Sequence, residues 1–228
     1  MFYITNRDYA TLIMDSGTLL LMIGIIYLTS RNRKKGRMDE SCFFILLILN
    51  IIIAAGDMLA YTTEEKVFPG SYVMATTGMT VFYVGFVLIS MAWLHYCRVR
   101  FKDGGLPDRS HFSYEYLPGL ITVGLVLINV FTGWIFSYDS EVMYHRGVLF
   151  IPMYIVMAAY IVAGFFYVSR YRDKSSGRVL IPTWVYAFPL IFGVIFTFMV
   201  SGSASFAPIG IAISITFTHM GTINETSR

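Results

Sequence analysis

Between Asn129 and Phe150 the chain reads Asn-Val-Phe-Thr-Gly-Trp-Ile-Phe-Ser-Tyr-Asp-Ser-Glu-Val-Met-Tyr-His-Arg-Gly-Val-Leu-Phe. This stretch is a polar break between two long apolar segments, and the charge pattern assigns it to the non-cytoplasmic side. It opens with Trp134 and Tyr138, an aromatic pair of the type found at the level of lipid headgroups. It closes with Tyr144-His145-Arg146-Gly147, which places a cation at the start of the next segment. We therefore expect this loop to be the lid of any site that faces outwards.

The composition predicts an integral membrane protein. Of 228 residues, 56% are hydrophobic and 14% are charged, whereas a soluble domain has about a quarter charged residues. The mean hydropathy is +0.64 and the pI is near 8.8. This pI does not indicate a nucleic-acid partner, because the basic residues fall in short loops beside apolar segments, as in cytoplasmic loops of membrane proteins. We expect a multi-pass protein of the cell membrane, whose surroundings are the lipid bilayer.

Seven segments are long and apolar enough to span a bilayer, which takes about 20 residues. They are residues 9–30, 41–61, 72–97, 114–134, 148–170, 180–200 and 206–223. The breaks between them are too short for a soluble domain. The basic run follows the first segment, so that segment reads as a span and not as a cleaved signal peptide. The predicted fold is an all-α bundle of seven transmembrane helices, forming one domain over residues 1–228.

The loop charges predict the orientation of this bundle. The loops after the first, third and fifth segments hold 13 of the 17 Lys and Arg residues, and such residues collect on the cytoplasmic side of membrane proteins. The opposite side has Arg7, Lys66 and Arg146. We therefore expect the N-terminus outside and the C-terminus in the cytoplasm. Cys42 and Cys97 then lie near the cytoplasmic face, where thiols stay reduced.

Polar residues at bilayer depth indicate a candidate site. Asp15 and Asp57 lie in the outer halves of the first and second segments, and Asn129 lies near the outer end of the fourth. A charge at the bilayer centre costs about 2.5–3.5 kcal/mol on insertion scales, so such groups usually face the bundle interior or a water-filled cavity. We expect these residues to converge in an outward-facing pocket. The alternative is that they form hydrogen bonds between packed helices.

The loop above this pocket supplies further candidates. Arg146 could pair with Asp57 or Asp15, could bind an anionic ligand with its planar guanidinium, or could face solvent or headgroups. His145 could act as a proton sensor, although an interfacial role is the simpler interpretation. The predicted ligand-binding residues are Asp15, Asp57, Tyr83, Asn129, Trp134, Tyr144, His145 and Arg146.

The sequence contains no recognisable catalytic motif. The four histidines show no pairing at metal-ligand spacing, and there is no nucleophile elbow or phosphate-binding loop. The seventh segment has no lysine for a retinal Schiff base. We therefore expect no enzymatic activity, no metal and no cofactor. A small-molecule transporter or channel is the alternative function, favoured by prolines in the late segments but opposed by the odd number of segments and the shortage of midplane polar residues.

Seven short-looped spans with an outward N-terminus resemble the N-terminal sensor regions of bacterial signalling proteins of the histidine kinase and diguanylate cyclase types. The loop also resembles the pattern of that group, through Asn129-x-Phe131-Thr132-Gly133-Trp134-Ile135-Phe136 and Tyr144-His145-Arg146-Gly147-x-x-Phe150. The resemblance implies a receptor for a small amphipathic or charged molecule, a peptide or a lipid headgroup.

The same resemblance implies a cytoplasmic kinase or cyclase module as the output. We expect this module either beyond Arg228 in a longer protein or as a recruited partner, and a homodimer is compatible with either arrangement. The last span would then act as a lever, with Ser214, Thr218 and Gly221 forming a small-residue stripe along which a neighbouring helix can slide.

Overall fold

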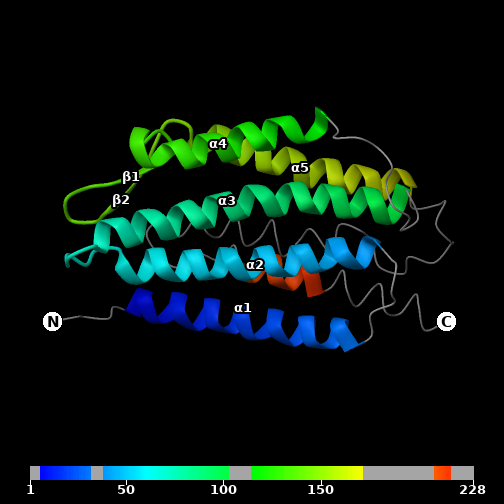
Figure 1. Cartoon of the computed structure of the whole chain (residues 1–228), viewed down its shortest axis with the longest axis horizontal. Coiled ribbons are helices and arrows are strands. Elements are labelled where there is room, and N and C mark those ends of the chain that lie inside the picture. Colours follow the sequence, from blue (N-terminus) through cyan, green and yellow to red (C-terminus); the bar gives the residue numbers. More distant parts are fainter. Residues whose placement is uncertain (1–5, 32–37, 103–113, 172–207, 217–228) are drawn as a thin grey trace.

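Long helices run from one end of the molecule to the other. The computed structural model of the chain describes residues 6–31, 38–102, 114–171 and 208–216. Figure 1 shows the long helices side by side, with the connection between α4 and α5 at the end where α1 begins. We call this the hairpin end and the opposite end the basic end. The long helices are α1 (Asn6–Arg31), α2 (Met38–Thr63), α3 (Ser71–Cys97), α4 (Leu117–Thr132) and α5 (Phe150–Tyr171), and residues 208–216 form a further helix.

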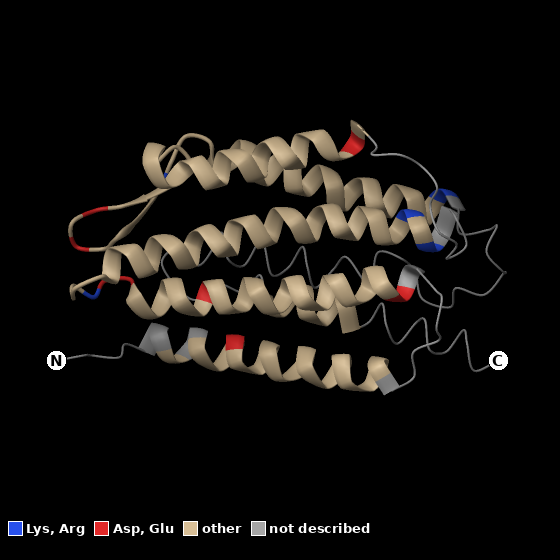
Figure 2. Ribbon diagram, in the orientation of Figure 1, with Lys and Arg blue, Asp and Glu red and all other residues tan. Residues whose placement is uncertain are grey.

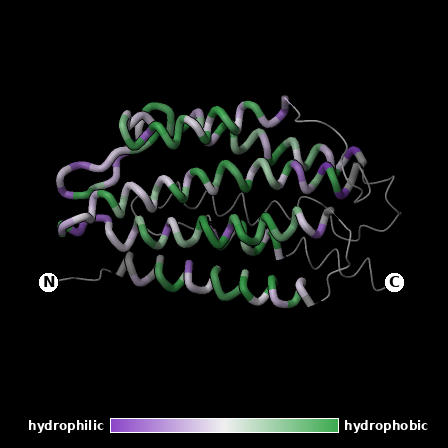
Figure 3. Tube along the Cα trace, in the orientation of Figure 1, coloured by the Kyte–Doolittle hydropathy of each residue, from purple (hydrophilic) through white to green (hydrophobic). Residues whose placement is uncertain are grey.

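The long helices have the length and hydropathy of membrane spans. Large apolar side chains point away from the bundle, among them Ile13, Leu20 and Val162, which are 71%, 72% and 66% exposed. Figure 3 shows that apolar residues follow the middle of the helices and polar residues gather near their ends. The chain is therefore a multi-pass membrane protein, as its composition predicts. The spans are Leu12–Ser30, Glu40–Thr63, Ser71–Arg100, Tyr114–Thr132 and Phe150–Arg170.

These five spans confirm the first five of the seven predicted segments. The sixth predicted segment, residues 180–200, lies outside the described residues. The seventh, residues 206–223, is helical over its described part, 208–216. Pro208 is the first described residue of that helix, and proline is tolerated in the first turn of a helix because the N–H groups there have no helical acceptor. Thr218 and Gly221 of the predicted stripe lie outside the described residues.

Helix α3 is the centre of the bundle and contacts α2, α4 and α5. It packs most extensively on α2, because small residues let the two backbones meet. A Cβ atom on Gly78 would lie 2.6 Å from the Ala60 nitrogen and 2.8 Å from the Gly56 carbonyl oxygen. A side chain at Gly78 would therefore force the helices apart. Such close approach stabilises helix pairs in lipid through van der Waals contact.

Helix α1 contacts α2 and has one buried face. Thr18 Oγ1 donates a hydrogen bond to the Met14 carbonyl at 2.9 Å, so the helix itself satisfies this hydroxyl. Asp15 lies roughly 24 Å from the basic end of α1 and Asp57 roughly 29 Å from the basic end of α2, at about 1.5 Å per residue. The two acids thus lie at similar depth, toward the hairpin end. The buried stripe of α1 consists of Asp15, Thr18, Met22, Ile25 and Thr29.

The connection between α4 and α5 contains a β-hairpin where the sequence predicts no strand. Strand β1 (Phe136–Tyr138) pairs antiparallel with β2 (Tyr144–Arg146), and Tyr138 lies opposite Tyr144. In β1 the outer two residues are buried and Ser137 is exposed. Strands of three residues are too short for this alternation to be recognised within an aromatic-rich segment.

The basic end closes the bundle on its other side. Helix α3 continues into a π-helix, η1 (Arg98–Lys102), and a 3-10 turn, η2 (Tyr114–Tyr116), leads into α4. Arg98 Nη1 lies 3.6 Å from Glu115 Oε2. The Tyr160 hydroxyl accepts a hydrogen bond from the Gly119 N–H and donates one to the Glu115 carbonyl. Figure 2 shows that Lys and Arg gather at this end, opposite the hairpin.

Candidate functional site

The Asn129 side chain fixes the hairpin to the end of α4. Its Nδ2 donates to the Phe136 carbonyl at 2.8 Å. Its Oδ1 accepts from the N–H groups of Ile135, at 2.6 Å, and Phe136, at 3.3 Å. Asn129 is 2% exposed. Because the loop backbone uses both ends of this amide, Asn129 positions the hairpin rather than reaching a ligand.

Two glycines of the loop pattern have a similar structural role. Gly133 ends α4 in the left-handed conformation, with φ of 65°, and its N–H donates to the Asn129 carbonyl at 2.8 Å. Glycine adopts this conformation without steric cost, which is why it commonly ends helices. At Gly147 a Cβ atom would overlap the Trp134 carbonyl group. Both halves of the loop pattern therefore contain a glycine that the hairpin geometry requires.

Asp139 organises the turn between the two strands. Its Oδ1 accepts from the N–H groups of Glu141 and Met143, each at 2.9 Å. Its Oδ2 lies 3.0 Å from His145 Nε2. The hydrogen bond with His145 is the largest of the effects that lower the pKa of Asp139, and the backbone hydrogen bonds add to it. His145 is thus exposed and tied to its own hairpin.

Tyr144 docks the hairpin onto two helices. Its hydroxyl lies 2.7 Å from the hydroxyl of Tyr83 on α3, which is 3% exposed. Its N–H donates to Glu64 Oε1, just beyond the end of α2, at 3.3 Å. The neighbouring Glu65 N–H donates to the Val142 carbonyl at 3.1 Å. These contacts hold the hairpin against the ends of α2 and α3.

Aromatic rings fill the space beneath the hairpin. The Phe136 ring centroid lies 5.5 Å from that of Tyr83, and the Tyr138 centroid lies 5.9 Å from that of Tyr144. Ring pairs at such distances contribute about 0.5–1.5 kcal/mol each beyond their buried area. We call this group the aromatic cluster, and its members are Tyr83, Phe136, Tyr138, Tyr144, Phe150 and Tyr154.

Two buried carboxylates lie against the aromatic cluster. Glu64 is 8% exposed and Asp57 is 1% exposed, which confirms that Asp57 faces the bundle interior. Burial raises the pKa of Tyr138 well above its usual value, and the negative charges of Glu64 and Asp57 raise it further. Burial also raises the pKa of Tyr144 to about 12, while the hydrogen bond with Tyr83 opposes this shift. Both phenols are therefore neutral hydrogen-bond donors near pH 7.

Arg146 lies at the rim of the aromatic cluster. Its Cζ atom is 4.9 Å from the centroid of the Phe150 ring, within the range of a cation–π interaction. Its positive charge also lowers the pKa of Tyr144, although burial of Tyr144 outweighs this effect. The proposed pairing of Arg146 with Asp57 stays a prediction.

The structure brings together four of the eight predicted site residues: Asp57, Tyr83, Tyr144 and Arg146. Asn129 supports them from α4, and Asp15 is buried on α1 at a similar depth. Trp134 is 51% exposed and His145 lies on the outer side of the hairpin, so neither belongs to the cluster.

Some members of this group are not predicted by the sequence, and one lies elsewhere than its sequence context predicts. Tyr138 was expected at headgroup level beside Trp134, but it is 7% exposed, because strand alternation turns it inward. Glu64 went unrecognised, although an acid at the end of an apolar segment is a visible signal. Phe136 and Phe150 are visible in the sequence as parts of the loop pattern, but their spacing does not predict that both rings pack on Tyr83.

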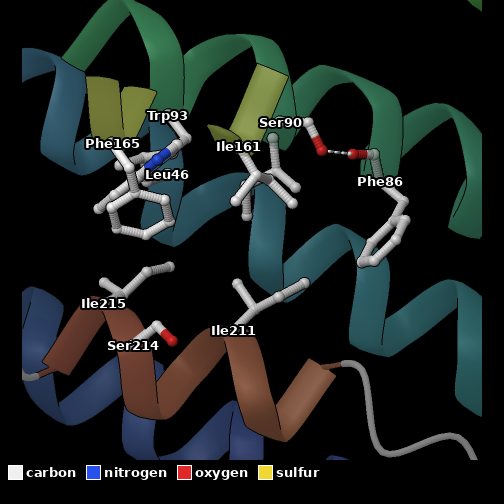
Figure 4. A pocket seen from close by; sticks show the side chains of 10 residues that line it. Leu46, Phe86, Ser90, Trp93, Ile161, Phe165, Ile211, Ser214 and Ile215 are labelled. Atoms are coloured by element: carbon white, nitrogen blue, oxygen red, sulfur yellow. Dashed lines mark hydrogen bonds between the residues drawn. The ribbon is translucent and has the colours of Figure 1, made fainter. Parts of the chain in front are cut away.

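A separate cavity of about 40 Å³ lies nearer the basic end. Figure 4 shows side chains of the helix 208–216 facing those of α3 and α5 across it. The Ser90 hydroxyl donates to the Phe86 carbonyl at 2.9 Å, so this serine is satisfied within α3. The volume suits one or two water molecules and is far below that of a drug-sized site. The lining residues are Leu46, Phe86, Ile89, Ser90, Trp93, Ile161, Phe165, Ile211, Ser214 and Ile215.

Comparison of the chain with protein-family models, with curated proteins and with solved structures found no match.

Proposed function

We propose that the chain is the membrane sensor region of a bacterial signalling protein, which receives an extracytoplasmic signal at the hairpin end and passes it to a cytoplasmic kinase or cyclase module. The observation that carries this proposal is the attachment of the hairpin. Tyr144 joins it to Tyr83 and Glu64 through polar contacts, and Glu64 follows buried Asp57 by about two helical turns along α2. The hairpin meets α2 and α3 partly through hydrogen bonds, which a ligand could replace with its own, so this attachment is suited to respond to a ligand. The basic end would then be cytoplasmic, in keeping with its Lys and Arg residues.

Helix α3 offers a route for the signal. Tyr83, Phe86, Ser90 and Trp93 share one face of α3 at the helical period and extend over about 15 Å. Tyr83 contacts the hairpin, whereas the other three line the cavity that faces the helix 208–216. A shift of α3 under the hairpin would therefore reach the last predicted span, which supports the role of that span as a lever. Signalling also requires a ligand with different affinities for the two positions of the lever.

Spin-label distances test this proposal. One label replaces Val162 on α5 and the other replaces Ile213, since both side chains are exposed. The background carries Cys42→Ala and Cys97→Ala, which remove two buried cysteines. A receptor predicts that a compound bound at the hairpin end shifts the 162–213 distance distribution without accumulating inside vesicles. A control pair at Ile155 and Val162, both on α5, should show no shift.

A transporter is the second candidate, and Asn50 favours it. Asn50 is fully buried in α2, and its Oδ1 and Nδ2 have no hydrogen-bond partner among the described residues. Polar groups at this depth are typical of transport pathways. If a compound accumulates in vesicles while the 162–213 distance stays unchanged, the receptor proposal fails and the transporter replaces it.

A further inference from the structure

The aromatic cluster and its carboxylates form a compact acidic, π-rich site. Phe150 and Tyr154 lie 4.8 Å apart between ring centroids, and Tyr83 contacts both rings. The carboxylates of Asp57 and Glu64 lie close enough to this group for their charges to act on the Tyr138 phenol. With Arg146 as the counter-charge, the group has a formal net charge of −1. Negative charge beside several ring faces attracts cations and repels anions.

Arg146 shows how a cation sits in this site. Its guanidinium lies over the Phe150 ring at 4.9 Å. The faces of aromatic rings attract cations through their quadrupole, and sets of such rings are the usual means of binding alkylated ammonium groups. Arg146 is exposed, so it occupies the rim of the cluster and leaves the inner rings to other groups.

The Tyr138 hydroxyl is a second sign of an incomplete site. Tyr138 is 7% exposed, and its hydroxyl has no hydrogen-bond partner among the residues that the structure describes. The Tyr138 ring centroid lies 5.9 Å from that of Tyr144, whose N–H donates to Glu64 Oε1 at 3.3 Å, so Tyr138 lies on the side of the cluster where Glu64 is held. A buried hydroxyl without a partner is destabilising, and a ligand or water that supplies an acceptor would remove that cost.

We propose that the hairpin end binds a small organic monocation of the ammonium type, with its charge between Asp57, Glu64 and the aromatic cluster and a polar group within reach of the Tyr138 hydroxyl. This inference rests on the proposed receptor function and names the chemical class of its ligand. The guanidinium of Arg146 would oppose this binding, because its like charge lies over the Phe150 ring at the rim of the same cluster. Its entry requires the hairpin to separate from Tyr83 and Glu64, because these contacts close the cluster from above.

Three probes of one shape and different charge test the class of ligand. Choline carries the ammonium group and a hydroxyl, 3,3-dimethylbutan-1-ol is its uncharged carbon isostere, and 3,3-dimethylbutanoate is an anion of the same outline. Binding of each radiolabelled probe to the full chain in lipid nanodiscs is measured by equilibrium dialysis. We expect choline to bind at least about tenfold more tightly than the other two. The attraction of one positive charge to the faces of partly desolvated aromatic rings changes a dissociation constant by about this factor.

Variants locate the bound charge. Asp57→Asn and Glu64→Gln should each weaken choline binding by about tenfold, because each removes one negative charge. Glu141→Gln, which removes an exposed acid on the same hairpin, should change the affinity by less than about twofold. Arg146→Met should strengthen choline binding by about three- to tenfold, since it removes the opposing like charge but keeps an apolar stem. Misfolding cannot produce such a gain.

The outcomes separate this inference from the receptor proposal. Equal binding of the isostere, preferential binding of the anion, loss of choline binding in Arg146→Met, or no choline binding at millimolar concentrations would overturn the cation site. If the anion binds instead and shifts the 162–213 distance, the receptor stands while the cation site falls. If choline binds as expected and the distance stays unchanged, the cation site stands while the receptor falls.

Discussion

The substitution Gly78→Ala tests the packing that organises the bundle. The added Cβ atom would lie 2.6 Å from the Ala60 nitrogen and 2.8 Å from the Gly56 oxygen. Both obstacles are backbone atoms of α2, so no side-chain rotation can relieve them. Restoring ordinary contact would move the helices apart by about 0.8 Å, and a gap of that size removes a quarter to a half of the dispersion energy of each separated atom pair.

The expected effect follows from two opposing contributions. Overpacking in a tight core destabilises by about 1–3 kcal/mol, and the gain in helix propensity from glycine to alanine offsets up to about 1 kcal/mol of that. Gly78→Ala should therefore lower the free energy of unfolding by about 1–2 kcal/mol, measured by reversible denaturation in mixed micelles. The matched control is Gly24→Ala on α1, where no atom beyond the helix's own neighbouring backbone lies within 4 Å of the new Cβ. If Gly78→Ala is as stable as Gly24→Ala, the described contact between α2 and α3 is incorrect.

Three other predictions concern the hairpin and the orientation. Asn129→Ala should release the hairpin and lower the free energy of unfolding by about 2–4 kcal/mol, because three backbone hydrogen bonds lose their partner; an unchanged hairpin in spin-label distances would contradict this. The raised pKa of Tyr144 stabilises the docked hairpin fully below about pH 10, the usual tyrosine value, and this stability should be lost as the pH rises toward about 12. Tyr144→Phe should reduce that pH dependence without abolishing it, because burial also raises the pKa of Tyr138; an undiminished dependence would show that Tyr144 does not contribute to it. When intact cells are treated with an impermeant thiol reagent, a single cysteine at Ser140 should react and a single cysteine at Ser176 should not. The reverse pattern would overturn the orientation.

Sequence periodicity and length were sufficient for the helices but not for the connection between α4 and α5. The second predicted segment, residues 41–61, agrees with the observed span Glu40–Thr63 to within two residues at each end. The agreement is close because a helix is one of the few stable forms of an apolar run of bilayer length. Asp57 was correctly expected to face inward, since a charge at that depth is too costly in lipid. The length of the apolar segments and the cost of a charged side chain within the bilayer were enough for these predictions.

The hairpin depends on contacts that spacing does not reveal. Asn129 was expected in a pocket, but its amide instead binds backbone groups six and seven residues further along the chain. Tyr138 was expected at the membrane surface, and only the pairing of β1 with β2 shows that it points inward. The same polar and aromatic residue types serve structure and binding, so their roles become distinguishable only when their partners are known.

The hairpin tip also stores conformational energy. Val142 and Glu65 both adopt φ of 60°, and they are the non-glycine residues of the described chain with positive φ. Each such conformation costs on the order of 1–3 kcal/mol, and a β-branched side chain such as that of Val142 is especially ill suited to it. The hydrogen bond from the Glu65 N–H to the Val142 carbonyl joins the two strained residues across the gap between the hairpin and the α2–α3 connection. Each conformation belongs to a local turn, because the Val142 N–H donates to the Asp139 carbonyl and the Lys66 N–H donates to the Thr63 carbonyl. The hairpin therefore meets the α2–α3 connection through two residues in unfavourable backbone conformations, and a change of backbone angles at either residue would both release conformational energy and move a group of the hydrogen bond that joins them.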